Sequence, residues 1–466
     1  MDRTLSQQPS SATHDLVSEA LRHHQAGQFA EAEQIYRQVL AVEPDHPDAL
    51  HLLGMVAYQT GRDEAAVELI RRAIAIKSDA ASYHSNLGNV LQSQGKLAEA
   101  GACYQRALVL KPDLAEVHLN LGNIFKAHGD VDSGLACYRR ALALNPQSAE
   151  AAVAESMALL LKGDFAAGWR NFEQRWQTKD YDTKTRTYTQ PLWTGDPLTS
   201  GRVLIWGEQG IGDEIMFAGL VPDVLRTGNR CALDCDARLQ PLFSRSFPGV
   251  EVVSTVEPGT HPELDMVAHL PSGSLPGLFR ASPASFAETT SPYLLADPAE
   301  RDRFRARYFD GRKLVGLAWH TKNKKTGRSR SIDLSLLAPL LVRPGIRWIS
   351  LQYGDHDWLR EQATATNAPL LIDPDVDQLS NIDRFAAQIA AMDLVITIDN
   401  SAAHLAGALG VPTWVLLPFS PDWRWLLSRE DSPWYPTTRL FRQTSLGDWG
   451  SVVRDVENAL GQNAPS

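Results

Sequence analysis

The sequence predicts an α-helical repeat array followed by two α/β lobes, each built on a parallel sheet. In the first part, glycines recur at a constant step of 34 residues, at Gly27, Gly61, Gly95, Gly129 and Gly163. Past residue 199 that period ends. Short apolar runs such as VLIW, KLVGLAW and LVITI then alternate with helix-like segments, which is typical of buried parallel strands. With 466 residues, the chain is also too long for a single hydrophobic core.

The composition is that of a water-soluble protein, with 44% hydrophobic and 21% charged residues. A net charge of −10 argues against nucleic acid or acidic membranes as partners, and no apolar run is long enough to cross a bilayer. The four cysteines show no metal-ligand spacing. We therefore expect a cytoplasmic protein without a metal site, a cofactor, a transmembrane segment or a nucleic-acid partner.

Between the periodic glycines, the pattern is that of paired helices. The first helix of three successive repeats carries a Leu-Gly pair (53–54, 87–88 and 121–122), and the second carries apolar residues at steps of four and three, such as Ala100, Tyr104 and Ala107. The period and these positions are similar to those of tetratricopeptide repeats (TPRs). That resemblance implies a solenoid over residues 14–176, behind a disordered tail at 1–13, with a concave face for an extended peptide.

The last repeat ends in GWRNFEQRW, residues 168–176. Its tryptophans could form a ligand platform, but we favour the interpretation that they cover the end of the solenoid against the next domain. A polar stretch then predicts a linker over 177–198. The α/β part breaks near residues 291–313, which predicts Rossmann-like lobes at 199–297 and 298–466. Ligands of such lobes bind beyond the carboxyl ends of the strands.

The first of those strand ends is VLIWGEQGIGDEIMF, residues 203–217. Glycines at such a turn are typical of dinucleotide binding, but Gly207, Gly210 and Gly212 read G-x-x-G-x-G instead of G-x-G-x-x-G. Glu208 and Asp213 would also repel a phosphate. The turn is better suited to a carboxylate that accepts a proton from a hydroxyl, with Asp213 as the candidate base and Glu208 as the spare. In the alternative interpretation, Asp213 only caps the helix.

A second strand end, ITIDNSAAHLAGALG at 396–410, supplies a candidate anion site. The strand ends at Asp399, and Asn400 and Ser401 precede a helix whose free N–H groups and dipole favour a phosphate. His404, in the first turn of that helix, is placed to donate to a phosphate oxygen. The alternative is a capped helix whose His404 hydrogen-bonds locally.

The strand VGLAWH (315–320) leads into a basic loop, TKNKKTGRSRS, which predicts a phosphate clamp opposite that helix. The candidate donor-binding residues here are His320, Lys322 and Arg330, with Gln352 at the end of a neighbouring strand. Solvated surface charge is the common alternative for such a run. The stretch PDWRWLLSREDSPWYP (421–436) is aromatic enough to stack on a base or sugar, although packing between the lobes explains it equally well.

The stretch DNSAAHLAGALGVPT (399–413) resembles the signature of heptosyltransferase-like GT-B glycosyltransferases, and Gly212-Asp213 with Pro222 resembles their G-D motif. GWRNFEQRW, RSI (330–332), SLQ (350–352) and DWRW (422–425), together with the repeats, are similar to those of bacterial TPR-containing glycosyltransferases. The resemblance implies an acceptor-binding first lobe, a second lobe that binds a nucleotide-sugar donor at the strand–helix turn, and a catalytic base at Asp213. The sequence departs from it at Asn400-Ser401, where relatives have Thr/Ser-Gly, and at His320, where many have a small residue.

Together these features predict an inverting, metal-independent glycosyltransferase whose TPRs recognise a protein acceptor, such as flagellin or another surface protein. Acidic Asp-x-Asp triplets (within 234–236, 355–357 and 373–377) could hold a divalent cation, but such triplets are common by chance. One alternative is transfer to a lipopolysaccharide or lipid-linked sugar. The other is an inactive TPR scaffold, to which the departure at Asn400 lends weight.

Overall fold

The computed structural model describes residues 11–178, 186, 188–254, 265–323 and 326–462. The chain divides into two compact units, Met1–Ala154 and Glu155–Ser466, which we name the repeat unit and the α/β unit. The boundary falls inside helix α9 (Ala149–Lys162), upstream of the predicted end of the solenoid at residue 176. Most of the predicted tail (1–13) and part of the predicted linker (177–198) lie outside the described residues.

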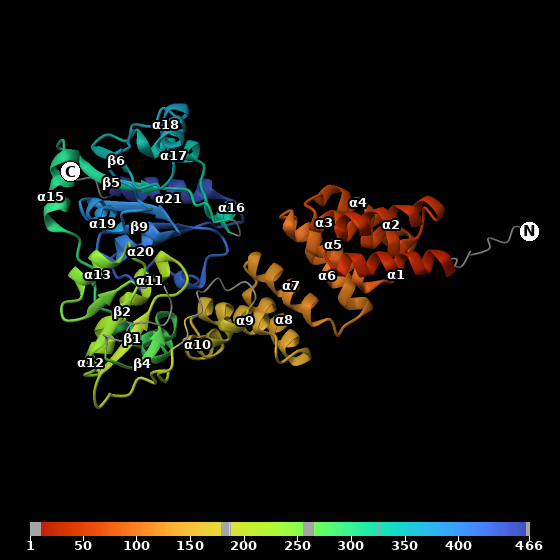
Figure 1. The fold of residues 1–466 in the computed structure, drawn as a ribbon. Helices are drawn as coiled ribbons and strands as arrows, with labels where there is room; N and C mark the ends of the chain where they lie inside the picture. The colour runs from red at the N-terminus through yellow and green to blue at the C-terminus, as the bar shows by residue number, and fades with distance from the viewer. Residues whose placement is uncertain (1–10, 179–185, 187, 255–264, 324–325, 463–466) are drawn as a thin grey trace, which may run out of the picture. The chain divides into compact units, whose positions relative to one another are not determined.

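The repeat unit is a series of helical hairpins (Figure 1). Each turns at a periodic glycine, whose φ angle between +74° and +81° is left-handed and costs glycine no steric strain. The paired helices touch at the predicted small residues: a Cβ atom would lie 2.5 Å from the Tyr104 ring at Gly88, and 2.6 Å from the Tyr138 ring at Gly122. The helices are α1 (Ser11–Gln25), α2 (Phe29–Val42), α3 (Pro47–Gln59), α4 (Asp63–Ile76), α5 (Ala81–Ser93), α6 (Leu97–Leu110), α7 (Ala115–Ala127) and α8 (Val131–Leu144).

The first lobe of the α/β unit contains a parallel sheet with the strand order β3-β2-β1-β4. Strand β2 lies on one side of β1 and β4 on the other, so the order of the strands reverses between β1 and β4. Such a reversal opens a crevice at the carboxyl ends of the strands. The lobe consists of β1 (Arg202–Trp206), α11 (Ile211–Ala218), α12 (Val221–Arg226), β2 (Cys231–Asp234), α13 (Gln240–Ser246), β3 (Glu251–Val253), β4 (Met266–Pro271), η3 (Ser272–Ser274), α14 (Leu275–Phe279) and η4 (Pro283–Glu288).

The second lobe contains a parallel sheet with the order β10-β9-β8-β5-β6-β7, which reverses between β5 and β8. Its elements before the reversal are α15 (Pro298–Tyr308), β5 (Lys313–Ala318), α16 (Gly327–Arg330), α17 (Leu334–Leu341), β6 (Ile346–Ser350), α18 (His356–Ala365), β7 (Leu370–Leu371) and α19 (Ile382–Ala390). Those after it are β8 (Leu394–Ile398), α20 (Ser401–Ala408), β9 (Thr413–Leu417), η5 (Trp423–Trp425), β10 (Thr438–Arg442) and α21 (Trp449–Gln462).

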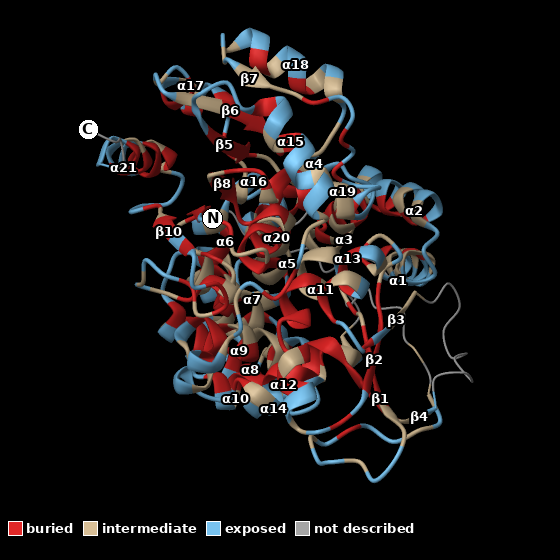
Figure 2. Cartoon of the chain, turned by 90° about the vertical axis from the view of Figure 1, so that its left-hand side faces the viewer, coloured by how far each residue is buried: buried red, intermediate tan, exposed pale blue. Residues whose placement is uncertain are grey.

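The predicted fold class is confirmed: a helical solenoid precedes two lobes built on parallel sheets. The central strands are buried on both faces, as their continuous apolar runs predict, and Figure 2 shows them in the interior, with exposed helix faces outside. Every residue of β8 and β9 is buried. No helix among the described residues has the length and apolar character of a membrane span.

Candidate functional site

The predicted site residues follow strands at the two points where the strand order reverses. Asp213 lies just after β1, residues 399–404 follow β8, and residues 320–330 follow β5. The turns after β1 and β8 lie against each other, because a Cβ atom on Gly212 would be 3.1 Å from Cδ2 of His404 and 3.7 Å from Cα of Ser401. The fold therefore brings the strand–helix turns of both lobes into one site.

Asp213 links the two lobes. Gly210 is the N-cap of α11, and Oδ2 of Asp213 accepts a hydrogen bond from the Gly210 N–H at 3.3 Å. Oδ1 of Asp213 accepts from the guanidinium of Arg424, which lies in η5 of the second lobe. Arg424 also donates to Oδ1 of Asp422 at 2.6 Å. Asp213 thus stabilises the helix end from the third position of α11, and it makes an ion pair that the sequence did not predict.

The geometry contradicts the role of Glu208 as a spare base. The side chains of Glu208 and Arg175 are both fully buried, and Arg175 donates to the carboxylate through Nη2 at 2.7 Å and through Nε at 3.0 Å. The N–H of Gly273 donates to the same carboxylate at 2.8 Å. This pair joins η1 (Glu173–Gln177) and η3 to the turn after β1. A carboxylate held in this way has a structural role.

Asn400 occupies the anion site predicted at the start of α20. It is the N-cap residue, and its side-chain oxygen accepts from the N–H groups of Ala402 at 2.9 Å and Ala403 at 3.3 Å. Oγ1 of Thr397 donates to the same oxygen at 3.1 Å. The Asn400 side chain thus takes up the N–H groups that the sequence assigns to a phosphate, and Asn400 belongs to the Asn400-Ser401 pair at which the sequence departs from the family signature. Ser401 is the first residue of the helix.

His404 is buried and hydrogen-bonded within the protein. Its Nδ1 lies 2.9 Å from the hydroxyl of Tyr435, and its ring stacks on Trp425 with a centroid distance of 5.4 Å. Burial and the nearby charge of Arg424 lower the pKa of His404, which favours the neutral ring. The geometry is therefore that of the alternative interpretation, a capped helix with a locally bonded histidine.

The basic loop after β5 faces the turn after β8. Nη1 of Arg330 donates to Oδ2 of Asp399 at 3.2 Å and to its carbonyl oxygen at 3.3 Å. Lys322 is exposed, and its backbone N–H donates to the Tyr353 hydroxyl at 2.6 Å. Burial, with the charge of Lys322, lowers the pKa of His320. Lys324 and Lys325, which belong to the predicted clamp, lie outside the described residues.

Gln352 serves the backbone instead of a ligand. It is fully buried, and its side-chain oxygen accepts from the N–H groups of Trp319 at 2.9 Å and His320 at 2.8 Å. Its amide nitrogen donates to the carbonyls of His320 at 3.0 Å and Tyr353 at 2.9 Å. Since these bonds use both its oxygen and its nitrogen, Gln352 holds the loop after β5 in place, and the geometry contradicts its assignment as a donor-binding residue.

The tryptophans of GWRNFEQRW pack within the α/β unit. Trp169, on α10 (Phe165–Phe172), donates from Nε1 to the carbonyl of Arg280 at 2.9 Å and lies edge-on to Trp423 with a centroid distance of 5.2 Å. Trp423 and Trp425 are also buried. The packing interpretation therefore describes Trp169, Trp423 and Trp425.

The acidic triplets have other partners. Asp234 pairs with Arg186, and Asp355 caps α18. Asp373 accepts from the Tyr308 hydroxyl at 2.6 Å and from Arg307 at 2.8 Å. Across the part of the chain that the structure describes, no group of three or more histidine, cysteine, aspartate or glutamate side chains is placed to hold a metal ion.

Sequence reasoning missed the residues that connect these turns. Arg424 lies in the DWRW motif and Arg175 in FEQRW, but neither motif indicates which residue the arginine contacts. Glu214 follows Asp213 directly in the sequence, but it belongs to none of the motifs described above. Its carboxylate lies in a cavity at the carboxyl end of the first sheet.

Comparisons with known proteins identify the first part of the chain. Models of the tetratricopeptide repeat match residues 23–89 and 115–148, and a model described as TPR repeat matches residues 88–129. The chain contains tetratricopeptide repeats. Solved structures similar to it include a crystal structure of MamA (21% identity, TM-score 0.31, 33% of this chain and 91% of that one) and PilF of Pseudomonas aeruginosa (23%, 0.33, 35% and 76%). TM-scores this low carry no further conclusion.

A curated relative extends beyond the repeats. Protein FlbA of Caulobacter vibrioides is 30% identical over 348 residues, which cover 67% of this chain and 55% of FlbA. The chain thus spans about half the length of that relative. A match over 67% of the chain is longer than the TPR matches, so part of the α/β unit has a counterpart in FlbA.

Proposed function

We propose that this protein is a glycosyltransferase that moves a sugar from a nucleotide-sugar donor to a protein acceptor bound by its TPRs. The observation that carries the proposal is the contact between Gly212 and His404, which joins the turns after β1 and β8. Two parallel-sheet lobes that meet at their switch-point turns offer a site to two substrates, one from each lobe. The G-D and DNSAAHLAGALG motifs, which resemble those of GT-B glycosyltransferases, lie at these two turns.

On the donor side, the proposal assigns the diphosphate to the space between the loop after β5 and the start of α20. Lys322 and Arg330 supply positive charge, and His320, Asp399, Ser401 and His404 border the same turns. For a phosphate to accept hydrogen bonds from the N–H groups of Ala402 and Ala403, the side chain of Asn400 must first release them. Cationic side chains and a helix end neutralise a leaving diphosphate without a divalent cation.

On the acceptor side, the proposal gives the first lobe the reacting hydroxyl. The acceptor oxygen attacks the anomeric carbon while a carboxylate of the turn after β1 accepts its proton, which inverts the configuration at that carbon. TPR arrays bind extended peptides on their concave face, so the repeat unit supplies the affinity for a protein acceptor and raises its local concentration. A cytoplasmic location belongs to this proposal, because nucleotide sugars are made there.

One observation favours an inactive scaffold as the second candidate. Asn400 caps α20, and Arg330 and Arg424 are paired with carboxylates of the protein itself, so the helix end and both arginines are already engaged. In that case, the TPRs would carry the function. Transfer to a lipopolysaccharide or lipid-linked sugar is a variant of the enzyme proposal. The identity of the modified product distinguishes that variant from transfer to a protein.

A nucleotide panel tests the proposal. Thermal shift and saturation-transfer NMR with UDP-, GDP-, ADP- and CMP-sugars should show binding of one nucleotide class, and Arg330→Ala should weaken it by about tenfold or more, as for a lost charge-assisted hydrogen bond. Arg360→Ala, which removes an exposed arginine on α18, is the matched control. Absence of binding across the panel would leave the scaffold as the function.

A further inference from the structure

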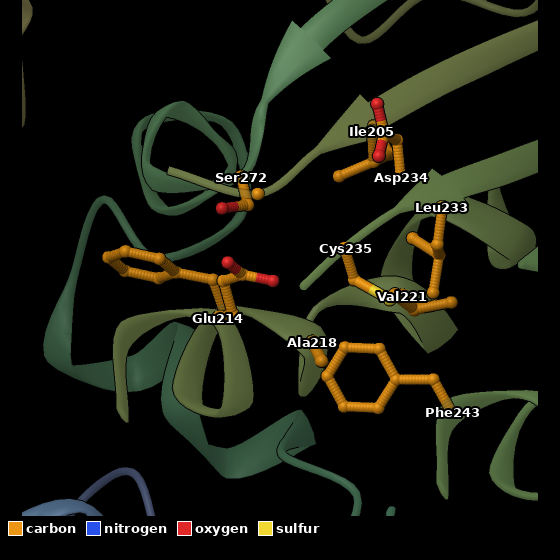
Figure 3. Close-up of a pocket in the computed structure, with 11 residues that line it drawn as sticks. Ile205, Glu214, Ala218, Val221, Leu233, Asp234, Cys235, Phe243 and Ser272 are labelled. Atoms are coloured by element: carbon orange, nitrogen blue, oxygen red, sulfur yellow. The ribbon is translucent and has the colours of Figure 1, made fainter. Parts of the chain in front are cut away.

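A cavity lies at the carboxyl end of the first sheet, between β1, β2 and the start of η3. Its volume is about 20 Å³, and Glu214 and Ser272 are among its polar lining residues, with Phe217 and Phe243 among the apolar ones. Figure 3 shows the side chains of Glu214 and Ser272 bordering the same space. A cavity of this size accepts a water molecule or the end of a side chain, such as a hydroxyl with its carbon atom, and excludes a sugar ring.

The Glu214 carboxylate has an unusual setting in this cavity. Its Oε2 accepts a hydrogen bond from the N–H of Asp236 at 2.9 Å, and a Cβ atom on Gly207 would lie 2.5 Å from that oxygen, so only glycine leaves it room. Burial, which outweighs the bond from Asp236, raises the pKa of Glu214 to about 7. A carboxylate with this proton affinity is suited to accept a proton near neutral pH.

The Ser272 hydroxyl gives an independent sign of a ligand. Ser272 is 6% exposed and lines the cavity, and its Oγ has no hydrogen-bond partner in the described structure. A buried hydroxyl without a partner costs free energy, which a ligand with a hydrogen-bonding group would recover.

The other carboxylates of the turn are engaged. Both oxygens of Asp213 are bonded, one to Arg424 and the other to the N–H of Gly210, and Glu208 is buried against Arg175. Glu214 is the carboxylate of this turn that borders the cavity.

We propose that the cavity binds an alcohol hydroxyl of the acceptor and that Glu214 accepts its proton. This inference rests on the proposed function and changes the expected base from Asp213 to Glu214. Ser272 positions the hydroxyl through a hydrogen bond. The acceptor oxygen forms a bond to the anomeric carbon while the bond from that carbon to the diphosphate oxygen breaks. The nucleoside diphosphate leaves with the electron pair, and the proton passes from Glu214 to solvent.

The charged groups that face Glu214 set the pH dependence. Asp234 and Asp236 lie at the end of β2, with the Cys235 thiol between them, and their negative charges add to the effect of burial, whereas Arg186 opposes it. Asp234 is paired with Arg186, and Asp236 accepts from Arg238 at 2.8 Å. Turnover should therefore rise with pH and level off above about 7.

Donor hydrolysis by the full chain, with water as the acceptor, tests the base. Glu214→Gln keeps an acceptor for the Asp236 N–H but cannot take a proton, so hydrolysis should fall by about 100-fold or more, with nucleotide affinity unchanged. The rise of the rate with pH should disappear as well. Glu251→Gln, the same change at the opposite end of the sheet, is the control. Hydrolysis by Glu214→Gln at the wild-type rate would overturn the inference while leaving the proposed function in place.

A second measurement is independent of activity. Protein labelled with ¹³C at the glutamate side-chain carboxyl is titrated with pH, and the resonance missing in Glu214→Gln identifies Glu214. N-acetylserinamide should shift that resonance and its titration midpoint, and N-acetylalaninamide should not. Ser272→Ala should weaken the effect by about threefold to tenfold, as for one neutral hydrogen bond. If the two probes act alike, the cavity is not an alcohol site, whether or not the protein binds a nucleotide sugar.

Discussion

Arg424 in the second lobe donates to the carboxylate of Asp213 in the first, across 211 residues of sequence. The side chains are 13% and 20% exposed, so the ion pair is shielded from solvent, and it joins η5 to the start of α11. This ion pair therefore joins the two lobes at the point where their strand–helix turns meet.

This pair should contribute measurably to stability. In a double-mutant cycle of Asp213→Asn and Arg424→Gln, we expect a coupling free energy of about 1 to 3 kcal/mol from urea unfolding, because removing one partner leaves the other charge partly buried. The exposed pair Asp357–Arg360, with side chains 85% and 51% exposed, is the control, and its coupling should stay below about 0.5 kcal/mol. Equal coupling in the two pairs would contradict the structural role of the link.

Asn400→Gly should strengthen nucleotide binding. The substitution removes the side-chain oxygen that holds the N–H groups of Ala402 and Ala403, and a phosphate can then take its place. Glycine is a good N-cap residue, so the cost in stability is only about a few tenths of a kcal/mol. Isothermal titration with the nucleotide found in the panel should show an affinity about threefold to tenfold higher, as for a regained hydrogen bond. Unchanged affinity would mean that the phosphate binds elsewhere.

Glu208→Gln and Arg175→Met should each destabilise the α/β unit, by about 3 to 5 kcal/mol, because each removes one charge of a fully buried ion pair. The double variant Arg175→Met with Glu208→Met, which replaces the pair with apolar side chains, should recover part of that loss. Thermal unfolding followed by circular dichroism provides the measurement. A Glu208→Gln variant with normal stability and impaired turnover would restore Glu208 as a candidate base.

The free energy of unfolding should respond to the charge of Glu214. Its pKa is about 7 in the folded protein, against an ordinary value of 4.5, so the folded state binds more protons between these values. Stability from this group is fully present below pH 4.5 and falls as the pH rises through 7, by up to about 3 kcal/mol. The difference in melting temperature, Glu214→Gln minus wild type, should therefore increase as the pH is raised from 4.5 to 7.5. A constant difference would contradict the raised pKa.

The repeat unit should select the acceptor without affecting the donor. A variant that begins at Ser148 keeps the whole of α9, whose Ser156 hydroxyl donates to the Gly168 carbonyl at 2.8 Å, and so preserves the packing of α10. It should bind nucleotide sugar as the full chain does and should lose modification of the protein acceptor, which intact-mass spectrometry of that acceptor detects. If the shortened protein modifies the acceptor equally well, the TPRs have another role.

Local patterns predicted the fold well because they encode local geometry. The step of 34 gave the hairpins, and the small residues at Gly88 and Gly122 marked where the paired helices touch. Apolar runs gave the buried strands, and the residues after β1 and β8 marked the turns that meet. Each of these signals lies within a few residues of the structure it specifies.

The partners of the charged residues were not predictable in the same way. Arg175 pairs with Glu208, 33 residues later, and Arg424 pairs with Asp213, 211 residues earlier, so both pairs exist only once distant segments have packed together. Gln352 and Asn400 had been assigned to a ligand because they stand at strand ends, but the protein's own backbone uses their hydrogen-bonding atoms first. Sequence position identifies the place of such a residue and leaves open what it touches.

The periodic glycines with a left-handed backbone conformation also affect how this chain can change in evolution. Because a glycine forms the turn of each hairpin at the same phase of the 34-residue step, duplication or loss of one whole step restores the same turn and the same helix contacts. Unequal recombination within the array can therefore alter its length while leaving residues 155–466, and the chemistry proposed for them, unchanged. If the repeats bind the acceptor as proposed, a change in the number of repeats would alter acceptor choice without any substitution in the α/β unit.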